Sequence, residues 1–175
     1  MKKRNIISSI FGYFALTSGS IWFGAYIARL ITTYQMFEPN ELILKEYITP
    51  GNLPAIFQTV YPLVILSLFS YLILIVCFTL FLITIDLKLK ENGWLFIIAM
   101  IIYITFPFEA ILMTIDYKLF TIFYNELFTS KEILEIIIER LTMLSSFPII
   151  MILSYLSIPY FIIFKPFSLK TNNEN

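Results

Sequence analysis

The feature that most constrains this chain is one long apolar segment, residues 94–115, that contains a single carboxylate. These twenty-two residues, WLFIIAMIIYITFPFEAILMTI, are apolar almost throughout and place Glu109 just after Pro107. A helix rises about 1.5 Å per residue, so the segment is long enough to cross a hydrocarbon core of about 30 Å. An ionisable side chain inside such a helix costs roughly 2.5 kcal/mol or more. Glu109 therefore requires a partner, a proton or a wet cavity.

The composition extends the membrane interpretation to the whole chain. Its 175 residues are 59% hydrophobic with a mean hydropathy of +0.84, whereas soluble domains are nearer half apolar. The net charge is zero, which argues against nucleic-acid binding because that requires a basic face. Histidine is absent, and the single cysteine, Cys77, lies inside an apolar run. We therefore expect no cofactor, no histidine-based metal site and no intrachain disulfide.

Four apolar runs predict an all-α integral membrane protein built as a four-helix bundle. The expected helices are 6–36, 54–91, 94–128 and 131–164. We expect one domain over residues 1–164, followed by a polar tail at 165–175. The basic start is compatible with a signal peptide, but the apolar run after it is too long for a signal core. We interpret that run as an uncleaved first crossing.

The connections between these helices carry their own signals. Residues 35–53 combine charges with an apolar side, which predicts a short extracytoplasmic amphipathic helix begun near Pro39. Residues 92–93, Asn-Gly, predict the end of the second helix. Residues 129–132, T-S-K-E, form a capping box for the fourth helix, which we expect to flex at its two prolines. The third and fourth helices would each be about 52 Å long, so their hairpin should protrude from the bilayer.

Basic residues favour both termini in the cytoplasm, because positive charges collect on that side of membrane proteins. With this orientation the inner segments hold seven basic residues: Lys2, Lys3, Arg4, Lys88, Lys90, Lys165 and Lys170. The outer ends hold five: Arg29, Lys45, Lys118, Lys131 and Arg140. This bias predicts the orientation. We also expect a multi-pass protein of a bacterial-type inner membrane.

Small side chains on the first helix predict close packing on two sides, because they let helix backbones approach each other in lipid. At the helical period one face carries Ser8, Gly12, Ala15 and Gly19, and the opposite face carries Ser20, Gly24 and Ala28. We expect this helix to be sandwiched between two neighbours, with other membrane proteins or a second copy as possible partners. The alternative is that glycine and serine are simply common in membrane helices.

Polar residues on the third and fourth helices define a candidate site. The third helix has one polar stripe, and the fourth helix has another made of acidic and hydroxyl residues. If the two helices pair antiparallel, the stripes meet as a crevice open to the outside, with Glu109 near its floor. The candidate residues are Glu109, Thr105, Asp116, Arg29, Glu139, Arg140, Thr142 and Ser146.

Two interpretations of Glu109 remain open. It is accessible to protons or cations, as intramembrane acids on ion pathways are. Alternatively it is neutral, or paired with Arg29 or Arg140, and only fixes helix packing. Of the two arginines we expect Arg29 to be the partner, because the first helix looks central. The outer glutamates are more typical of a solvated helix face.

These observations favour a non-enzymatic accessory or assembly subunit that packs against other membrane proteins through its first helix. The phosphate-binding, dinucleotide-binding, zinc-protease and serine-hydrolase motifs are absent from the sequence. The alternative is a small carrier or channel in which Glu109 handles a proton or cation. A membrane enzyme ranks third, because the carboxylates have no nucleophile or metal set beside them.

Overall fold

The computed structural model describes residues 6–39, 41–125, 129–144 and 146–168. Five helices follow in chain order: α1 (Ile6–Tyr34), α2 (Leu53–Thr84), α3 (Gly93–Tyr124), α4 (Ser130–Thr142) and α5 (Phe147–Phe164). Within these ranges there are no strands, only two isolated bridges. Four helices, α1, α2, α3 and α5, are long and apolar enough to cross a membrane. The all-α prediction and the four membrane-length helices are confirmed.

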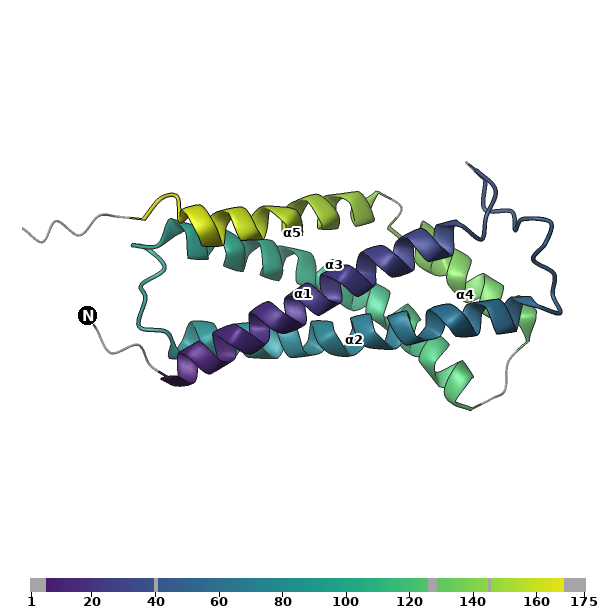
Figure 1. Ribbon diagram of the computed structural model, residues 1–175, viewed down its shortest axis with the longest axis horizontal. Helices are drawn as coiled ribbons and strands as arrows, with labels where there is room; N and C mark the ends of the chain where they lie inside the picture. Colours follow the sequence, from purple (N-terminus) through teal and green to yellow (C-terminus); the bar gives the residue numbers. More distant parts are fainter. Residues whose placement is uncertain (1–5, 40, 126–128, 145, 169–175) are drawn as a thin grey trace, which may run out of the picture.

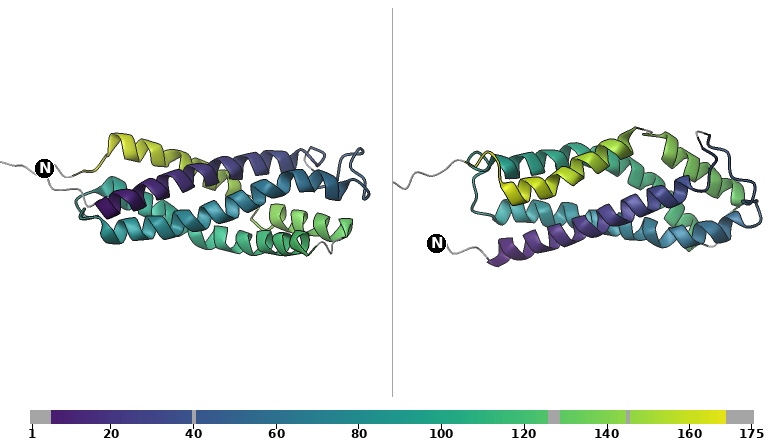
Figure 2. Two further views of the ribbon diagram at one scale, coloured as in Figure 1. Left: turned by 60° about the horizontal axis from the view of Figure 1, so that its bottom comes forward. Right: turned by 45° about the horizontal axis from the view of Figure 1, so that its top comes forward.

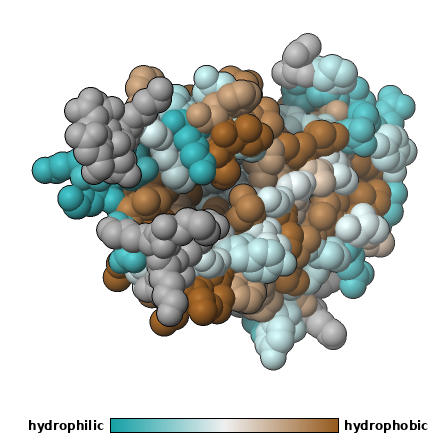
Figure 3. Space-filling view, turned by 60° about the vertical axis from the view of Figure 1, so that its left-hand side comes forward, coloured by the Kyte–Doolittle hydropathy of each residue, from teal (hydrophilic) through white to brown (hydrophobic). Residues whose placement is uncertain are grey.

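The helices are arranged along one common direction (Figure 1). α1 and α2 form the most extensive helix pair, and α3 packs against α5 along one half and α4 along the other. The start of α1, the α2–α3 connection and the end of α5 lie together, and we call this the terminal end (Figures 1 and 2). Figure 3 looks toward the terminal end and shows apolar side chains around a hollow.

The α1–α2 contact depends on the first small-residue face of α1. Ser8 and Ala15 are buried there. A Cβ atom at Gly12 would lie 3.0 Å from the Phe81 ring, and one at Gly19 would lie 3.3 Å from Leu74. The glycines therefore let α2 approach α1 closely, as expected for helices packed in lipid.

The second small-residue face of α1 has no such neighbour. Ser20, Gly24 and Ala28 are exposed. A Cβ atom at Gly24 would meet no atom of the described chain within 4 Å. The structure therefore covers one of the two predicted packing faces and leaves the other open.

The end of α2 differs from the prediction. The helix ends at Thr84 rather than at residue 91, and Ile85 is extended with ψ 135°. Asn92 bridges to Ser168, and the Gly93 amide donates to the Phe167 carbonyl at 3.1 Å. These contacts tie the α2–α3 connection to the chain beyond α5. Residues 92–93 therefore stand at the start of α3, whereas the prediction made them the end of the second helix.

The predicted helix 131–164 is two helices, α4 and α5, separated at residues 143–146. Pro148 lies in the first turn of α5, where its missing N–H costs no hydrogen bond. Its ring would clash with the preceding turn of a continuous helix. The proline thus starts a helix, whereas Pro159 is accommodated inside α5. The third predicted helix, 94–128, corresponds to α3, and residues 126–128 lie outside the described chain.

The first connection is also not the predicted amphipathic helix. Phe37 bridges to Leu44, and the Glu38 amide donates to the Ile43 carbonyl at 2.8 Å. Asn52 accepts a hydrogen bond from the Thr49 amide at 2.7 Å. The segment is bounded by prolines, which disfavour a helix through it, and it folds into turns.

The predicted capping box is confirmed. Thr129 is the N-cap of α4, its hydroxyl accepts from the Glu132 amide, and its own amide donates to the Glu132 carboxylate at 2.8 Å. The hydrogen bonds from Thr129 lower the pKa of Glu132. The ionised Glu132 carboxylate therefore stabilises the N-terminus of α4.

The end opposite the terminal end has a core of its own, which holds the α3–α4 hairpin. Ile133 and Ile137 of α4 are buried against Phe57 and Val60 of α2. The Ser130 hydroxyl donates to the Pro50 carbonyl in the first connection. The hairpin is thus packed against α2 and the first connection.

We expect Gly12→Leu combined with Gly19→Leu to destabilise the bundle, because both side chains would enter the α1–α2 contact. Overpacking of this kind typically costs roughly 1–3 kcal/mol. Gly24→Leu is the control, since it brings the same gain in helix propensity per substituted glycine without a contact. Thermal unfolding in detergent measures the difference. Equal melting temperatures for the double variant and Gly24→Leu would contradict the observed packing.

Candidate functional site

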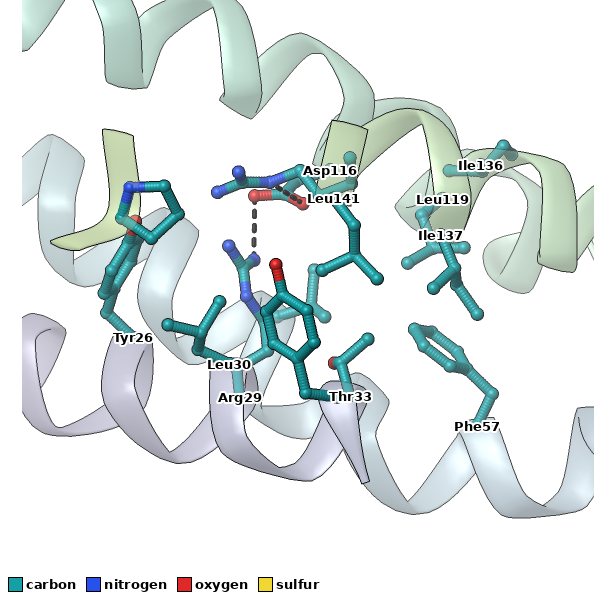
Figure 4. Close-up of a pocket in the computed structure, with 14 residues that line it drawn as sticks. Tyr26, Arg29, Leu30, Thr33, Phe57, Asp116, Leu119, Ile136, Ile137 and Leu141 are labelled. Atoms are coloured by element: carbon teal, nitrogen blue, oxygen red, sulfur yellow. Dashed lines mark hydrogen bonds and ion pairs between the residues drawn. The ribbon is translucent and has the colours of Figure 1, made fainter. Parts of the chain in front are cut away.

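Four charged side chains meet inside the bundle, and we call them the charge cluster: Arg29, Glu109, Asp116 and Arg140. Arg29 Nη1 donates to Asp116 Oδ2 at 2.8 Å, and Arg140 Nε donates to Asp116 Oδ1 at 3.2 Å. Figure 4 shows the Arg29 and Asp116 side chains pointing toward each other from α1 and α3. Asp116 is therefore held between two guanidinium groups.

Glu109 is the second acid of the charge cluster and pairs with Arg140. Arg140 Nη2 lies 3.7 Å from Glu109 Oε1, which is an ion pair but not a hydrogen bond. Arg29 was the expected partner of Glu109, and the structure places it on Asp116 instead. Where α1 crosses α3, Arg29 lies opposite Asp116. Asp116 is two helical turns beyond Glu109 on α3.

Helical periodicity positions these residues. Glu109 and Asp116 are seven residues apart, which places them on one face of α3. Arg29 continues the buried stripe of α1, seven residues after the buried Trp22. Arg140 occupies the last turn of α4, which packs against α3.

The charge cluster is nearly closed to its surroundings. The Glu109 side chain is 3% exposed and that of Arg140 is 14% exposed. Arg29 Nη1 also lies 3.3 Å from the Ser67 hydroxyl, which links α2 to the charge cluster. Taking ions out of water costs several kcal/mol each and is offset only where charges pair and hydrogen-bond well. With all four groups ionised the charge cluster is neutral.

The Glu109–Arg140 side of the charge cluster is less completely bonded. Among the residues described, Glu109 Oε2 and Arg140 Nη2 have no hydrogen-bond partner. A cavity of about 40 Å³ adjoins the cluster and is lined by Arg29, Asp116 and Arg140. This volume is sufficient for a water molecule, which needs roughly 10–15 Å³ by the same measure.

Thr105 lies apart from the charge cluster, next to an aromatic group. Its hydroxyl donates to the Ile101 carbonyl at 2.7 Å and lies 3.4 Å from the Tyr155 hydroxyl. The Trp22 ring centroid is 4.5 Å from that of Tyr155 and 4.9 Å from that of Tyr71. These rings join α1, α2 and α5 at the middle of the bundle.

The remaining predicted site residues are on the surface. Glu139 accepts from Lys118 Nζ at 3.0 Å, in an exposed pair. Thr142 donates to the Ile138 carbonyl of its own helix at 2.8 Å. Ser146 is exposed and makes no side-chain capping bond to α5.

The predicted crevice is therefore not formed. The buried face of α4 is Ile133, Ile137 and Leu141, so the acidic stripe on the other face turns outward. Arg140, one position beyond Glu139, turns inward instead. The break between α4 and α5 also prevents one stripe from continuing to Ser146.

Sequence reasoning did not single out the aromatic group or Ser67. Trp22 was detectable, because Ser8, Ala15, Trp22 and Arg29 follow one another at intervals of seven. Ser67 lies in a long uncharged run that gives no signal of a charged neighbour. Tyr71 and Tyr155 have no distinguishing spacing either.

The charge cluster ties α1, α3 and α4 together through ion pairs. The described part of the chain has no group of three or more metal-binding side chains. The two acids of the charge cluster are each paired with arginine. No protein-family model, curated protein or solved structure matches this chain.

We expect Asp116→Asn to destabilise the protein by about 3–5 kcal/mol, because it leaves two buried guanidinium groups with one carboxylate. Glu139→Gln is the matched control, since it removes an acid from an exposed ion pair and should cost at most about 1 kcal/mol. Equilibrium unfolding in mixed micelles measures both values. Equal losses in the two variants would show that the charge cluster contributes no more than a surface pair.

Proposed function

We propose that this chain is a non-enzymatic accessory or assembly subunit that packs against another membrane protein through the open face of α1. The observation that carries the proposal is the exposure of Ser20, Gly24 and Ala28 on a membrane-length helix. Small residues in such a helix allow a second helix to approach its backbone. Within the described residues, α2 covers the Gly12 and Gly19 face of α1, and no helix covers the Gly24 face.

The charge cluster supports this role, because it fixes the helix that carries the open face. Arg29 lies in the same helix as Gly24 and is bonded to both α2 and α3. A partner would therefore meet a preorganised surface, which reduces the entropy lost on binding.

We further propose a multi-pass arrangement in a bacterial-type inner membrane with the terminal end in the cytoplasm. Lys88, Lys90 and Lys165 belong to the segments at the terminal end. In the sequence, Lys2, Lys3 and Arg4 directly precede α1, which starts at the same end. Short cytoplasmic loops of membrane proteins carry such an excess of basic residues.

We expect Gly24→Leu to abolish association without unfolding the protein. The side chain would block a helix approaching from outside, while nothing in the described chain contacts it. Thr114→Leu, at an exposed position of α3, is the matched control. Association is measured by purification in mild detergent followed by mass determination of the intact complex. A monomeric wild-type protein, or a complex that survives Gly24→Leu, would contradict the proposal.

A second candidate is a small carrier or channel for a proton or cation. It is favoured by the cavity beside the charge cluster and by Glu109 Oε2, which lacks a hydrogen bond within the described chain. The internal neutralisation of all four charges favours the first proposal over this one.

The carrier function predicts that Glu109→Gln folds normally and loses flux, while Glu109→Asp keeps part of it. Proton or cation flux into liposomes that contain the purified protein measures this. Under the subunit proposal the wild-type protein gives no flux above empty liposomes. A wild-type flux that Glu109→Gln abolishes would contradict the subunit proposal.

A further inference from the structure

A groove of about 910 Å³ lies between α1, α2, α3 and α5 at the terminal end. Its volume is in the upper part of the range of about 300–1,000 Å³ typical of ligand sites. α5 and α1 separate toward the terminal end, and small residues of α1 line the space between them (Figures 1 and 2). The hollow visible in Figure 3 lies at this end of the molecule.

The groove has the depth of one leaflet. Its lining residues on α1 run from Ser8 to Phe23, fifteen steps or about 22 Å along a helix. Half of a bilayer with its headgroups measures about 20–22 Å. At the inner end the Tyr155 ring packs against Phe23 and Trp22, with centroid distances of 6.4 and 4.5 Å. The groove therefore opens at one membrane surface and is closed near the middle.

The depth of the groove distinguishes between a transmembrane helix and a single-leaflet amphiphile as its ligand. A transmembrane helix of another protein would have to continue for about 20 residues through both leaflets. The aromatic rings at the inner end of the groove block that path. An amphiphile of a single leaflet needs only the length that the groove provides.

The walls and mouth of the groove have the polarity of such an amphiphile. The walls include Phe78, Ile98 and Ile162, whereas charged residues and Trp94 lie at the mouth. Tryptophan is typical of the headgroup level of a membrane. The apolar walls therefore suit acyl chains, and the mouth suits a polar headgroup.

The charges at the mouth define the headgroup. Lys88 and Glu91 pair with each other at 3.1 Å. Lys165 Nζ lies 5.7 Å from the centre of the Trp94 ring. Neither Lys165 nor Asp86 forms an ion pair with any described residue. The mouth thus offers one cation and one anion to a ligand.

We propose that this groove binds one zwitterionic phospholipid, with its phosphate at Lys165, its ammonium group at Asp86 and its acyl chains between α1 and α5. The site rests on the membrane insertion proposed above. It shares Ser20 with the proposed partner face of α1, whereas Gly24 and Ala28 do not line the groove. The charge complementarity at the mouth favours a headgroup with both signs over a purely anionic one.

Native mass spectrometry of the full chain with added phosphatidylethanolamine tests the acyl-chain part. Leu156→Trp fills the groove from α5, and Leu153→Trp is the matched control at an exposed α5 position outside the lining. We expect one saturable lipid on the wild-type and control proteins, and binding at least about tenfold weaker for Leu156→Trp. Equal binding by both variants, or no saturable binding, would overturn the site.

The headgroup assignment is tested with surface variants that leave the helix packing intact. Lys165→Gln and Asp86→Asn should each weaken phosphatidylethanolamine binding several-fold, whereas Lys90→Gln, outside the groove, should not. Equal or tighter binding of phosphatidylglycerol would overturn the zwitterionic headgroup. Binding that occurs only after deletion of residues 169–175 would show that the chain itself fills the groove, and would overturn the proposal. Gly24→Leu should retain the lipid, which separates this site from the proposed partner face.

Discussion

Asp116 holds two arginines from different helices in the interior of the bundle, and the arrangement of four helices depends on that contact. A lone carboxylate or guanidinium in an apolar helix is costly. Here one carboxylate accepts from Arg29 at 2.8 Å and from Arg140 at 3.2 Å. The same contact connects α1, α3 and α4, and Ser67 adds α2. Each of these charges alone would be costly in an apolar helix. Paired with one another, they fix how the helices cross.

Because the four charges pair with one another inside the bundle, two other surfaces remain available for binding. Because the charges are satisfied internally, the open face of α1 and the groove beside α5 do not have to complete the core. Gly24 meets no atom of the described chain within 4 Å, and the groove stops at the aromatic rings around Trp22. The proposals above assign a helix to the first surface and a lipid to the second.

The sequence predicts the four membrane-length helices and the capping box at Thr129 well, because run length and capping are local properties. It does not predict the break before Pro148, since proline is tolerated both in a flexed helix and in the first turn of a new one. Nor does it predict which arginine meets Glu109, because that depends on where α1 crosses α3. The candidate residues that do come together are those whose stripes face the interior. Glu139 and Thr142 do not reach the charge cluster, because α4 buries its isoleucines on the opposite face.

A double-mutant cycle on Arg29→Met and Asp116→Leu measures the central contact most directly. Each single change leaves the charge cluster with a net charge, whereas the double change leaves only the neutral Arg140–Glu109 pair. We expect the double variant to be more stable than the sum of the single losses allows, with a coupling free energy of about 2 kcal/mol or more in mixed micelles. Losses that simply add would contradict the account, because the two side chains would then be acting independently.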